Sequence, residues 1–194
     1  MVQTTGSYAS EEGTRNMRII GVSGSLNRES TNSAVLARAA QTMRFPDQMV
    51  VFETLDDLPH FSPDRDHDPL PPHVTRWRDA VHAADALVIA TPEYAGGMPG
   101  ALKNGLDWLV GSGGLYGKPA VVVSVAPSGD RGQRARDSAE LTLLMQGAHV
   151  CDSFTVGLRR PASPDGIATC AAEVSRRAID ALTSGIGVLR DAEA

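Results

Sequence analysis

Short apolar runs alternate with amphipathic stretches along most of the chain. Each run is rich in Val, Ile, Leu or Ala and is short enough for a strand buried on both faces. The strands predicted in this way cover residues 17–22, 48–53, 86–90, 120–125 and 149–155. Between them, apolar residues recur at helical spacing. The predicted helices begin at Ser33, cover residues 74–84, begin at Pro99 and end at Gly111, and cover residues 133–145 and 168–189.

Strand and helix therefore alternate five times. This order is typical of an α/β fold in which a parallel sheet lies between two layers of helices, with a ligand crevice at the carboxyl ends of the strands. We expect residues 17–190 to form a single domain and residues 1–16, which are polar and lack periodicity, to be a disordered extension. Residues 55–72 are rich in Pro and Asp and are predicted to be an irregular surface excursion.

Composition and charge disfavour several classes of partner and location. A formal net charge of −5 over 194 residues disfavours nucleic acid as a partner, because phosphate binding needs a basic face. No apolar run approaches the roughly 20 residues of a membrane span, and no signal peptide is recognisable at the start. The two cysteines, Cys151 and Cys170, are too far apart for a Cys-x-x-Cys pair. We therefore expect a cytoplasmic protein without a membrane partner.

The loop after the first predicted strand carries the clearest sign of chemistry. Residues 21–32 read GVSGSLNRESTN and join that strand to a helix through small hydroxyl residues. A helix start attracts anions through its unpaired N–H groups and its dipole. Ser25, Ser30, Thr31 and Asn32 could add side-chain donors, and Arg28 could add a charge. The alternative is that Ser30 or Thr31 is an ordinary N-cap.

Two further loops at the same predicted edge are rich in Gly and Pro. Residues 91–100 read TPEYAGGMPG and offer the aromatic ring of Tyr94 together with glycines that permit close backbone approach. Residues 126–132 read APSGDRG and could direct backbone N–H groups into the same crevice. Each loop alone could be a tight turn, but three together favour a planar, anionic ligand. The P-loop and Gly-x-Gly-x-x-Gly motifs are both absent.

These motifs resemble the NAD(P)H-dependent FMN reductase family over about residues 17–189. The family pattern Gly-Ser-Leu-Arg-x-x-Ser-x-Asn is similar to residues 24–32, with Asn27 in the place of Arg and Arg28 next to it. The pattern Pro-Glu-Tyr-Asn-x-Ser-x-Pro-Gly-x-Leu-Lys-Asn-Ala-x-Asp-Trp is similar to residues 92–108, with Ala95 and Gly97 in the places of Asn and Ser. A third, glycine-rich motif is matched in part by residues 128–135, and Arg131 departs from it.

The resemblance implies a flavodoxin-like fold, a five-stranded parallel sheet of order 2-1-3-4-5 with helices on both faces. It also implies an enzyme that transfers hydride from NADPH or NADH to bound FMN and on to a flavin, quinone, azo or metal-oxyanion acceptor, and that works as a homodimer or homotetramer. By similarity, the residues that bind the cofactor are Ser25, Leu26, Asn27, Arg28, Ser30, Asn32, Pro92, Glu93, Tyr94, Ala95, Gly96, Gly97, Pro127, Ser128 and Gly129.

Hydride transfer between stacked rings needs no catalytic acid or base, so we expect no catalytic side chain. His60, His67 and His73 lie near several aspartates and could suggest a metal, but no ligand spacing supports that reading and we expect no metal site. Two other functions stay open: a flavodoxin-like one-electron carrier, and a family member with a degenerate flavin site.

Overall fold

In the computed structural model, which describes residues 16–43, 46–127, 130–159 and 161–193, the strands form one parallel sheet. Its order is β2-β1-β3-β4-β5, as the family resemblance implied. The strands are β1 (Arg18–Ser23), β2 (Gln48–Phe52), β3 (Ala86–Ala90), β4 (Pro119–Ala126) and β5 (His149–Gly157). β3 and β4 are buried along their whole length, because helices cover both faces of the sheet.

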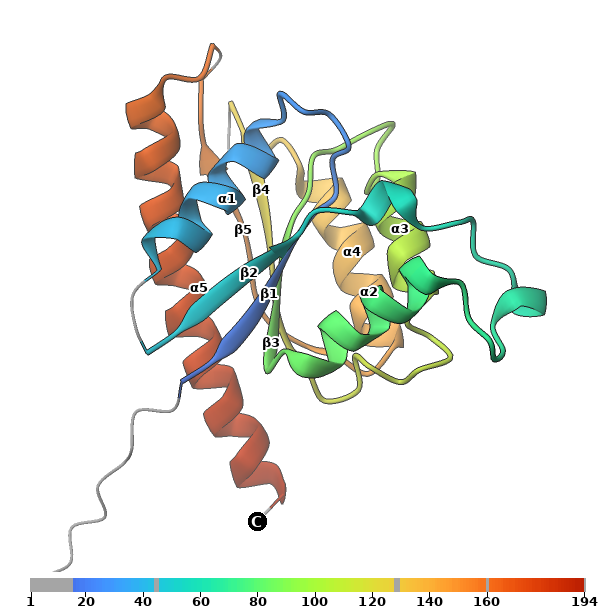
Figure 1. Ribbon diagram of the computed structural model, residues 1–194. Helices are drawn as coiled ribbons and strands as arrows, with labels where there is room; N and C mark the ends of the chain where they lie inside the picture. The colour runs from blue at the N-terminus through green and yellow to red at the C-terminus, as the bar shows by residue number, and fades with distance from the viewer. Residues whose placement is uncertain (1–15, 44–45, 128–129, 160, 194) are drawn as a thin grey trace, which may run out of the picture.

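The helices form two layers, which Figure 1 shows on either side of the sheet. One layer holds α1 (Thr31–Thr42) and α5 (Pro164–Glu193), and the other holds α2 (Pro72–Ala83), α3 (Gly100–Asp107) and α4 (Gln133–Met145). Each layer closes its own apolar core. Leu36 and Val174 lie in the core under α1 and α5, and Trp77 and Leu106 lie in the core on the opposite face.

Most predicted elements are confirmed within a few residues. The helix predicted over residues 133–145 is α4 itself, and α1 buries Val35, Leu36 and Ala39 as its periodicity predicted. The helix after Pro99 was predicted too long. α3 ends at Asp107, and turns replace the expected last helical turn before Gly111. The expected extension lies outside the described residues, except for Asn16.

The excursion between β2 and α2 is mostly irregular, as predicted, but it contains two short 3₁₀ helices, Leu55–Asp57 and Pro63–Arg65. α3 fixes it in place. The carbonyl oxygen of Pro59 accepts hydrogen bonds from Asn104 Nδ2 (3.0 Å) and from the Trp108 indole N–H (2.7 Å). The excursion is therefore a packed cover over one helical layer. No helix within the described ranges is long and apolar enough to cross a membrane.

Candidate functional site

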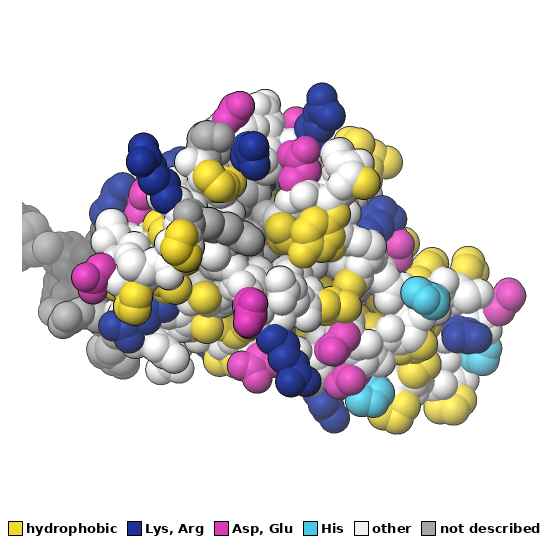
Figure 2. All heavy atoms as spheres, turned by 90° about the horizontal axis from the view of Figure 1, so that it is seen from above, with side chains coloured by type: hydrophobic (Ala, Val, Ile, Leu, Met, Phe, Trp, Pro, Cys, Tyr) yellow, Lys and Arg dark blue, Asp and Glu magenta, His cyan; other side chains and the backbone are white. Residues whose placement is uncertain are grey.

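Three loops meet at the edge of the sheet where the parallel strands end, the upper edge in Figure 1. They follow β1, β3 and β4. Backbone and side-chain hydrogen bonds join the strand ends at this edge: Gly24 N donates to Ala90 O (2.8 Å), Thr91 N to Val123 O (2.8 Å), and Ser124 Oγ to Thr91 O (2.7 Å). The three loops thus start from one rigid platform. Figure 2 looks onto this edge and shows basic and acidic side chains interspersed there.

The first loop turns sharply into α1. Asn27 Oδ1 accepts from Glu29 N (3.0 Å), and Ser30 N donates to Asn27 O (3.0 Å). Ser30 is the N-cap, with its Oγ accepting from Ser33 N at 3.4 Å. The ordinary-cap alternative is thus correct for the Ser30 side chain. The first turn of α1 contains no acidic residue, so the positive end of the helix dipole is not compensated there.

Asn32 is buried and hydrogen-bonds to β4. Its Oδ1 accepts from Val125 N (2.8 Å) and its Nδ2 lies 3.5 Å from Val125 O. The side-chain amide therefore fixes the start of α1 to the end of β4, 93 residues away in sequence. Asn32 positions the helix start, and its side chain is already occupied by these two contacts. The backbone N–H groups in the first turn of α1, such as that of Asn32, have no acceptor within the helix. They are therefore the donors that this loop can offer to a ligand.

The second loop forms a tight hairpin turn. Tyr94 N donates to Gly97 O (3.0 Å) and Gly97 N to Tyr94 O (3.1 Å). The two central residues, Ala95 (φ 50°) and Gly96 (φ 78°), both have positive φ, as a two-residue type I′ hairpin turn requires. The Tyr94 hydroxyl lies 3.2 Å from Ser25 Oγ, so the first and second loops are in direct contact.

The third loop leads from β4 to α4. Gly132 (φ 85°) ends it, and a Cβ at this position would lie 2.6 Å from the Ser124 Cβ, so only glycine fits. The Ser124 hydroxyl is also within 3.3 Å of Gly132 O. Pro127 is exposed at the rim. Ser128 and Gly129, both predicted to bind the cofactor, lie outside the described residues.

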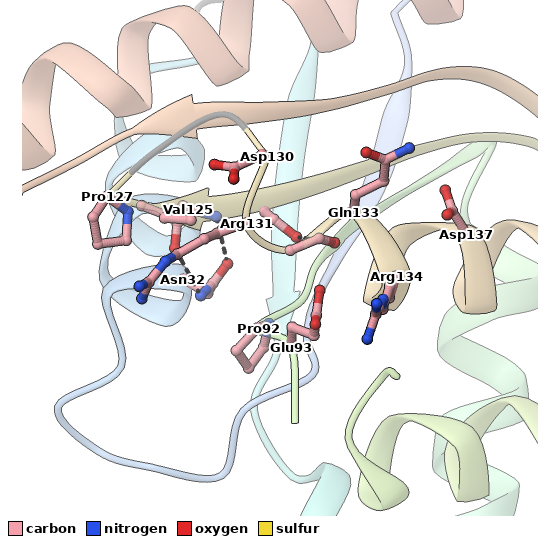
Figure 3. A pocket seen from close by; sticks show the side chains of 13 residues that line it. Asn32, Pro92, Glu93, Val125, Pro127, Asp130, Arg131, Gln133, Arg134 and Asp137 are labelled. Atoms are coloured by element: carbon pink, nitrogen blue, oxygen red, sulfur yellow. Dashed lines mark hydrogen bonds between the residues drawn. The ribbon is translucent and has the colours of Figure 1, made fainter. Parts of the chain in front are cut away.

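A cavity of about 820 Å³ lies between these loops (Figure 3). Its floor is the end of β4 with Asn32, and its walls come from the second loop and from the start of α4. The lining residues are Asn32, Pro92, Glu93, Ser124, Val125, Ala126, Pro127, Asp130, Arg131, Gly132, Gln133, Arg134 and Asp137. A volume of this size is ordinary for a cofactor site.

The predicted site residues do not all face this cavity. Asn32, Pro92, Glu93 and Pro127 line it. The exposed part of the first loop faces a neighbouring hollow instead, which is bordered by the end of β2 and is lined in part by Ser25, Leu26, Asn27 and Arg28. Ala95, Gly96 and Gly97 lie in the turn beside the cavity, where a Cβ on Gly96 would be 3.7 Å from an Arg134 guanidinium nitrogen.

Sequence reasoning did not single out Gln133 and Asp137, which α4 presents to the cavity. Both lie in the first turns of α4, and their positions could have been inferred from the rule that a helix after a parallel strand starts at the ligand edge. Arg131 was noted as a departure from the family pattern and lines the cavity.

The remaining candidate residues have structural roles. Burial raises the pKa of the Cys151 thiol and of the Cys170 thiol, and neither residue lines the cavity. His73 Nδ1 lies 3.6 Å from Asp57 Oδ2. Arg78 on α2 pairs with Asp66 of the excursion at 2.5 Å. Among the described residues, no group of three His, Cys, Asp or Glu side chains is close enough to hold a metal ion.

Comparisons with known proteins agree with this geometry. The model of a family described as NADPH-dependent FMN reductase matches residues 17–160. An NAD(P)H-dependent FMN reductase of Pseudomonas aeruginosa is 33% identical over 135 residues, 69% of this chain and 72% of the relative. A quinone reductase of Pseudomonas putida is 35% identical over 128 residues, 63% of this chain and 67% of the relative.

Among solved structures, the chain is similar to FerB, a flavoenzyme NAD(P)H:(acceptor) oxidoreductase from Paracoccus denitrificans. The TM-score is 0.69 at 24% identity, and the match covers 87% of this chain and 98% of that one. At this identity the likeness shows the fold, which is the flavodoxin-like fold expected from the sequence.

Proposed function

The chain belongs to the NADPH-dependent FMN reductase family, and from that premise we propose that it holds FMN in the cavity between the three loops and reduces small quinones at the expense of NADPH or NADH. The observation that supports this most directly is that the start of α1 forms part of the floor of an open cavity. Asn32 belongs to both, because it lies in the first turn of α1 and lines the cavity.

The residues present fit FMN. Its phosphate needs a positive site, and the start of α1 offers backbone N–H groups with no acidic side chain in the first turn. Its ring system needs flat walls and close backbone approach, which Pro92, the half-exposed Tyr94 and the glycines of the second turn provide. The volume of about 820 Å³ leaves room for a second planar molecule on the ring.

Bound FMN would supply the hydride chemistry, and the protein would supply binding and orientation. The Ser25–Tyr94 contact holds two of the loops in a fixed relation, and Ser124 links the ends of β3 and β4. Together these contacts would fix the distance between the phosphate site and the ring site. A rigid frame of this kind contributes to catalysis by holding reacting groups in position.

A quinone is the acceptor that we favour over the flavin, azo and metal-oxyanion alternatives. The quinone reductase of Pseudomonas putida is 35% identical to this chain.

The test is a visible spectrum of the full chain after incubation with FMN and desalting, followed by anaerobic oxidation of NADPH and of NADH with 1,4-benzoquinone. Retained yellow colour with turnover well above that of free FMN supports the proposal. Colour without turnover would indicate a one-electron carrier, and no retained colour a degenerate flavin site. Parallel assays with free FMN, an azo dye and chromate as acceptors decide whether quinones are preferred.

We also propose that two copies of the chain associate through the end of α4 and the turns after α3. Large apolar side chains are exposed there, among them Tyr116 (84% exposed), Met145 (78%), Leu141 and Val110. Val110, Tyr116 and Met145 also border a hollow of about 410 Å³. An apolar surface of this kind is costly in a monomer and is typical of a subunit interface.

Light scattering after size exclusion would give the assembly size, a dimer or a tetramer. Met145→Glu is expected to shift it toward the monomer. Val188→Glu, an equally conspicuous exposed apolar position on α5 (60% exposed), serves as the control and should leave it unchanged. A wild-type protein that is monomeric at micromolar concentration would refute the interface.

We also propose that the protein works in the reducing cytoplasm, which the two unpaired cysteines support.

A further inference from the structure

We propose that Arg131, on the loop after β4, supplies the guanidinium that binds the phosphate of FMN at the start of α1. This inference rests on the proposed function, because it assigns a residue to the cofactor of that same site. Its starting point is a missing charge. Asn27 stands where the family pattern has Arg, and Ser30 and Asn32, whose side chains cap the start of α1 and fix it to β4, carry no charge. A cation at the phosphate, in addition to the N–H groups of the helix start, would therefore come from another position.

Arg28 is the neighbour of Asn27 and lies on the outer side of the start of α1. It is exposed and lines two hollows, one bordered by the end of β2 and the other by Ser30, Thr31 and Pro161. It does not line the main cavity. A shift of one residue in this turn has thus moved the guanidinium away from the floor on which Asn32 lies.

Arg131 lines the main cavity together with Asn32. In Figure 3 its guanidinium points to the side of the cavity where Asn32 and Pro127 lie, and away from Gln133 and Asp137. Asp137, Glu93 and Arg134 line the opposite part of the cavity, and Asp130 precedes Arg131 in the third loop. The guanidinium of Arg131 and the start of α1 attract a phosphate to the part of the cavity where Asn32 lies.

The backbone of Arg131 is anchored. Thr155 Oγ1 donates to the carbonyl oxygen of Arg131 (3.3 Å), and the same oxygen of Thr155 accepts from the guanidinium of buried Arg136. Gly132 follows directly with φ 85°. These restraints fix the point from which the Arg131 side chain extends. None of the ion pairs between described side chains involves Arg131, so its charge stays available for a ligand.

The experiment compares FMN with riboflavin, which carries the same ring and no phosphate. Each flavin is titrated with the full chain, and quenching of flavin fluorescence gives Kd. Arg131→Gln is expected to weaken FMN binding about ten- to hundredfold, the size of one charge-assisted hydrogen bond. Riboflavin affinity should change less than about twofold. The FMN affinity of the wild type should also fall with added salt more steeply than that of Arg131→Gln.

Two matched variants complete the series. Arg28→Gln removes the guanidinium next to the family position, and Arg134→Gln removes one that lines the same cavity beside Gly96. Both should keep the wild-type ratio of FMN to riboflavin affinity. Because all three side chains are exposed, each variant should keep the wild-type melting temperature.

Equal loss for FMN and riboflavin in Arg131→Gln, or a phosphate-specific loss in Arg28→Gln alone, would overturn the inference while leaving the proposed function intact. A wild-type chain that binds neither flavin would instead refute the proposed function and the inference with it.

Discussion

The Ser25 hydroxyl and the Tyr94 hydroxyl lie 3.2 Å apart although 69 positions separate them in the sequence. This contact joins the loop after β1 to the loop after β3, the two segments expected to hold opposite ends of the same flavin. A hydrogen bond therefore links two loops of the proposed site directly, and its contribution to FMN binding can be measured.

Replacing Tyr94 by Phe removes the hydroxyl and keeps the ring. We expect FMN binding to weaken about three- to tenfold, the net worth of one hydrogen bond, because the two loops are then less firmly held together. Titration by fluorescence quenching measures the change. Tyr116→Phe is the control, since that ring is 84% exposed and distant in sequence from the loops. A similar loss in both variants would show that the Ser25–Tyr94 bond has no special role.

Asn32→Ala should destabilise the fold. It leaves the buried N–H of Val125 without its acceptor, which costs about 1–3 kcal/mol in the free energy of unfolding. Urea denaturation is the measurement. Asn27→Ala breaks a comparable side-chain contact in an exposed turn, where water replaces it, and should cost less than about 0.5 kcal/mol. Equal losses would mean that the α1–β4 contact contributes little.

Ala95 lies in the left-handed region with φ 50°. Glycine adopts this conformation easily because it has no Cβ, and asparagine tolerates it because its side chain can hydrogen-bond to the nearby backbone; alanine has neither advantage. Ala95→Asn is expected to raise the free energy of unfolding by up to about 1 kcal/mol. Ala95→Val should lower it, because a β-branched residue is strained further. Thermal unfolding checks both, and the opposite order would contradict a left-handed residue 95.

Gly132→Ala combines a left-handed backbone with a collision against Ser124, whose Cβ would lie 2.6 Å from the new methyl group. We expect a loss of about 2 kcal/mol in stability together with a distorted cavity wall. Gly187→Ala is the matched control. It lies in α5 with nothing within 4 Å of its Cβ position, and should be neutral or stabilising by up to about 1 kcal/mol. Near-equal melting temperatures of the two variants would refute the steric argument.

The cysteines should be unreactive in the folded protein. Burial raises the pKa of both Cys151 and Cys170 above the usual range of a thiol. At any pH below the raised pKa, a smaller fraction of the folded thiol than of an unfolded thiol is ionised, and only the thiolate reacts. Alkylation by iodoacetamide at pH 8 should thus be slower in the native chain than in urea, and should speed up as pH rises. Cys151→Ser and Cys170→Ser assign the sites, and faster labelling of the native chain would contradict the prediction.

Local sequence signals were sufficient for the elements and their order. Buried parallel strands are apolar without interruption, as in residues 86–90, and turn residues mark where they end. The three loops of the proposed site could be identified because small and polar residues follow three such strands directly. The excursion could be recognised as irregular from its prolines, but its short 3₁₀ helices and its anchoring to Trp108 depend on contacts from distant residues.

The sequence by itself determined the fold class, the family motifs and the edge at which the proposed site lies, because these follow from periodicity and from loop composition. Only the tertiary structure decided where each polar side chain is used. Asn32 hydrogen-bonds to Val125, a residue 93 positions away, and Arg131 enters the cavity while Arg28 does not. The physical reason is that a hydrogen bond or a charge acts over a few ångströms of space, and which groups come within that range is fixed only when the sheet and its helices have packed.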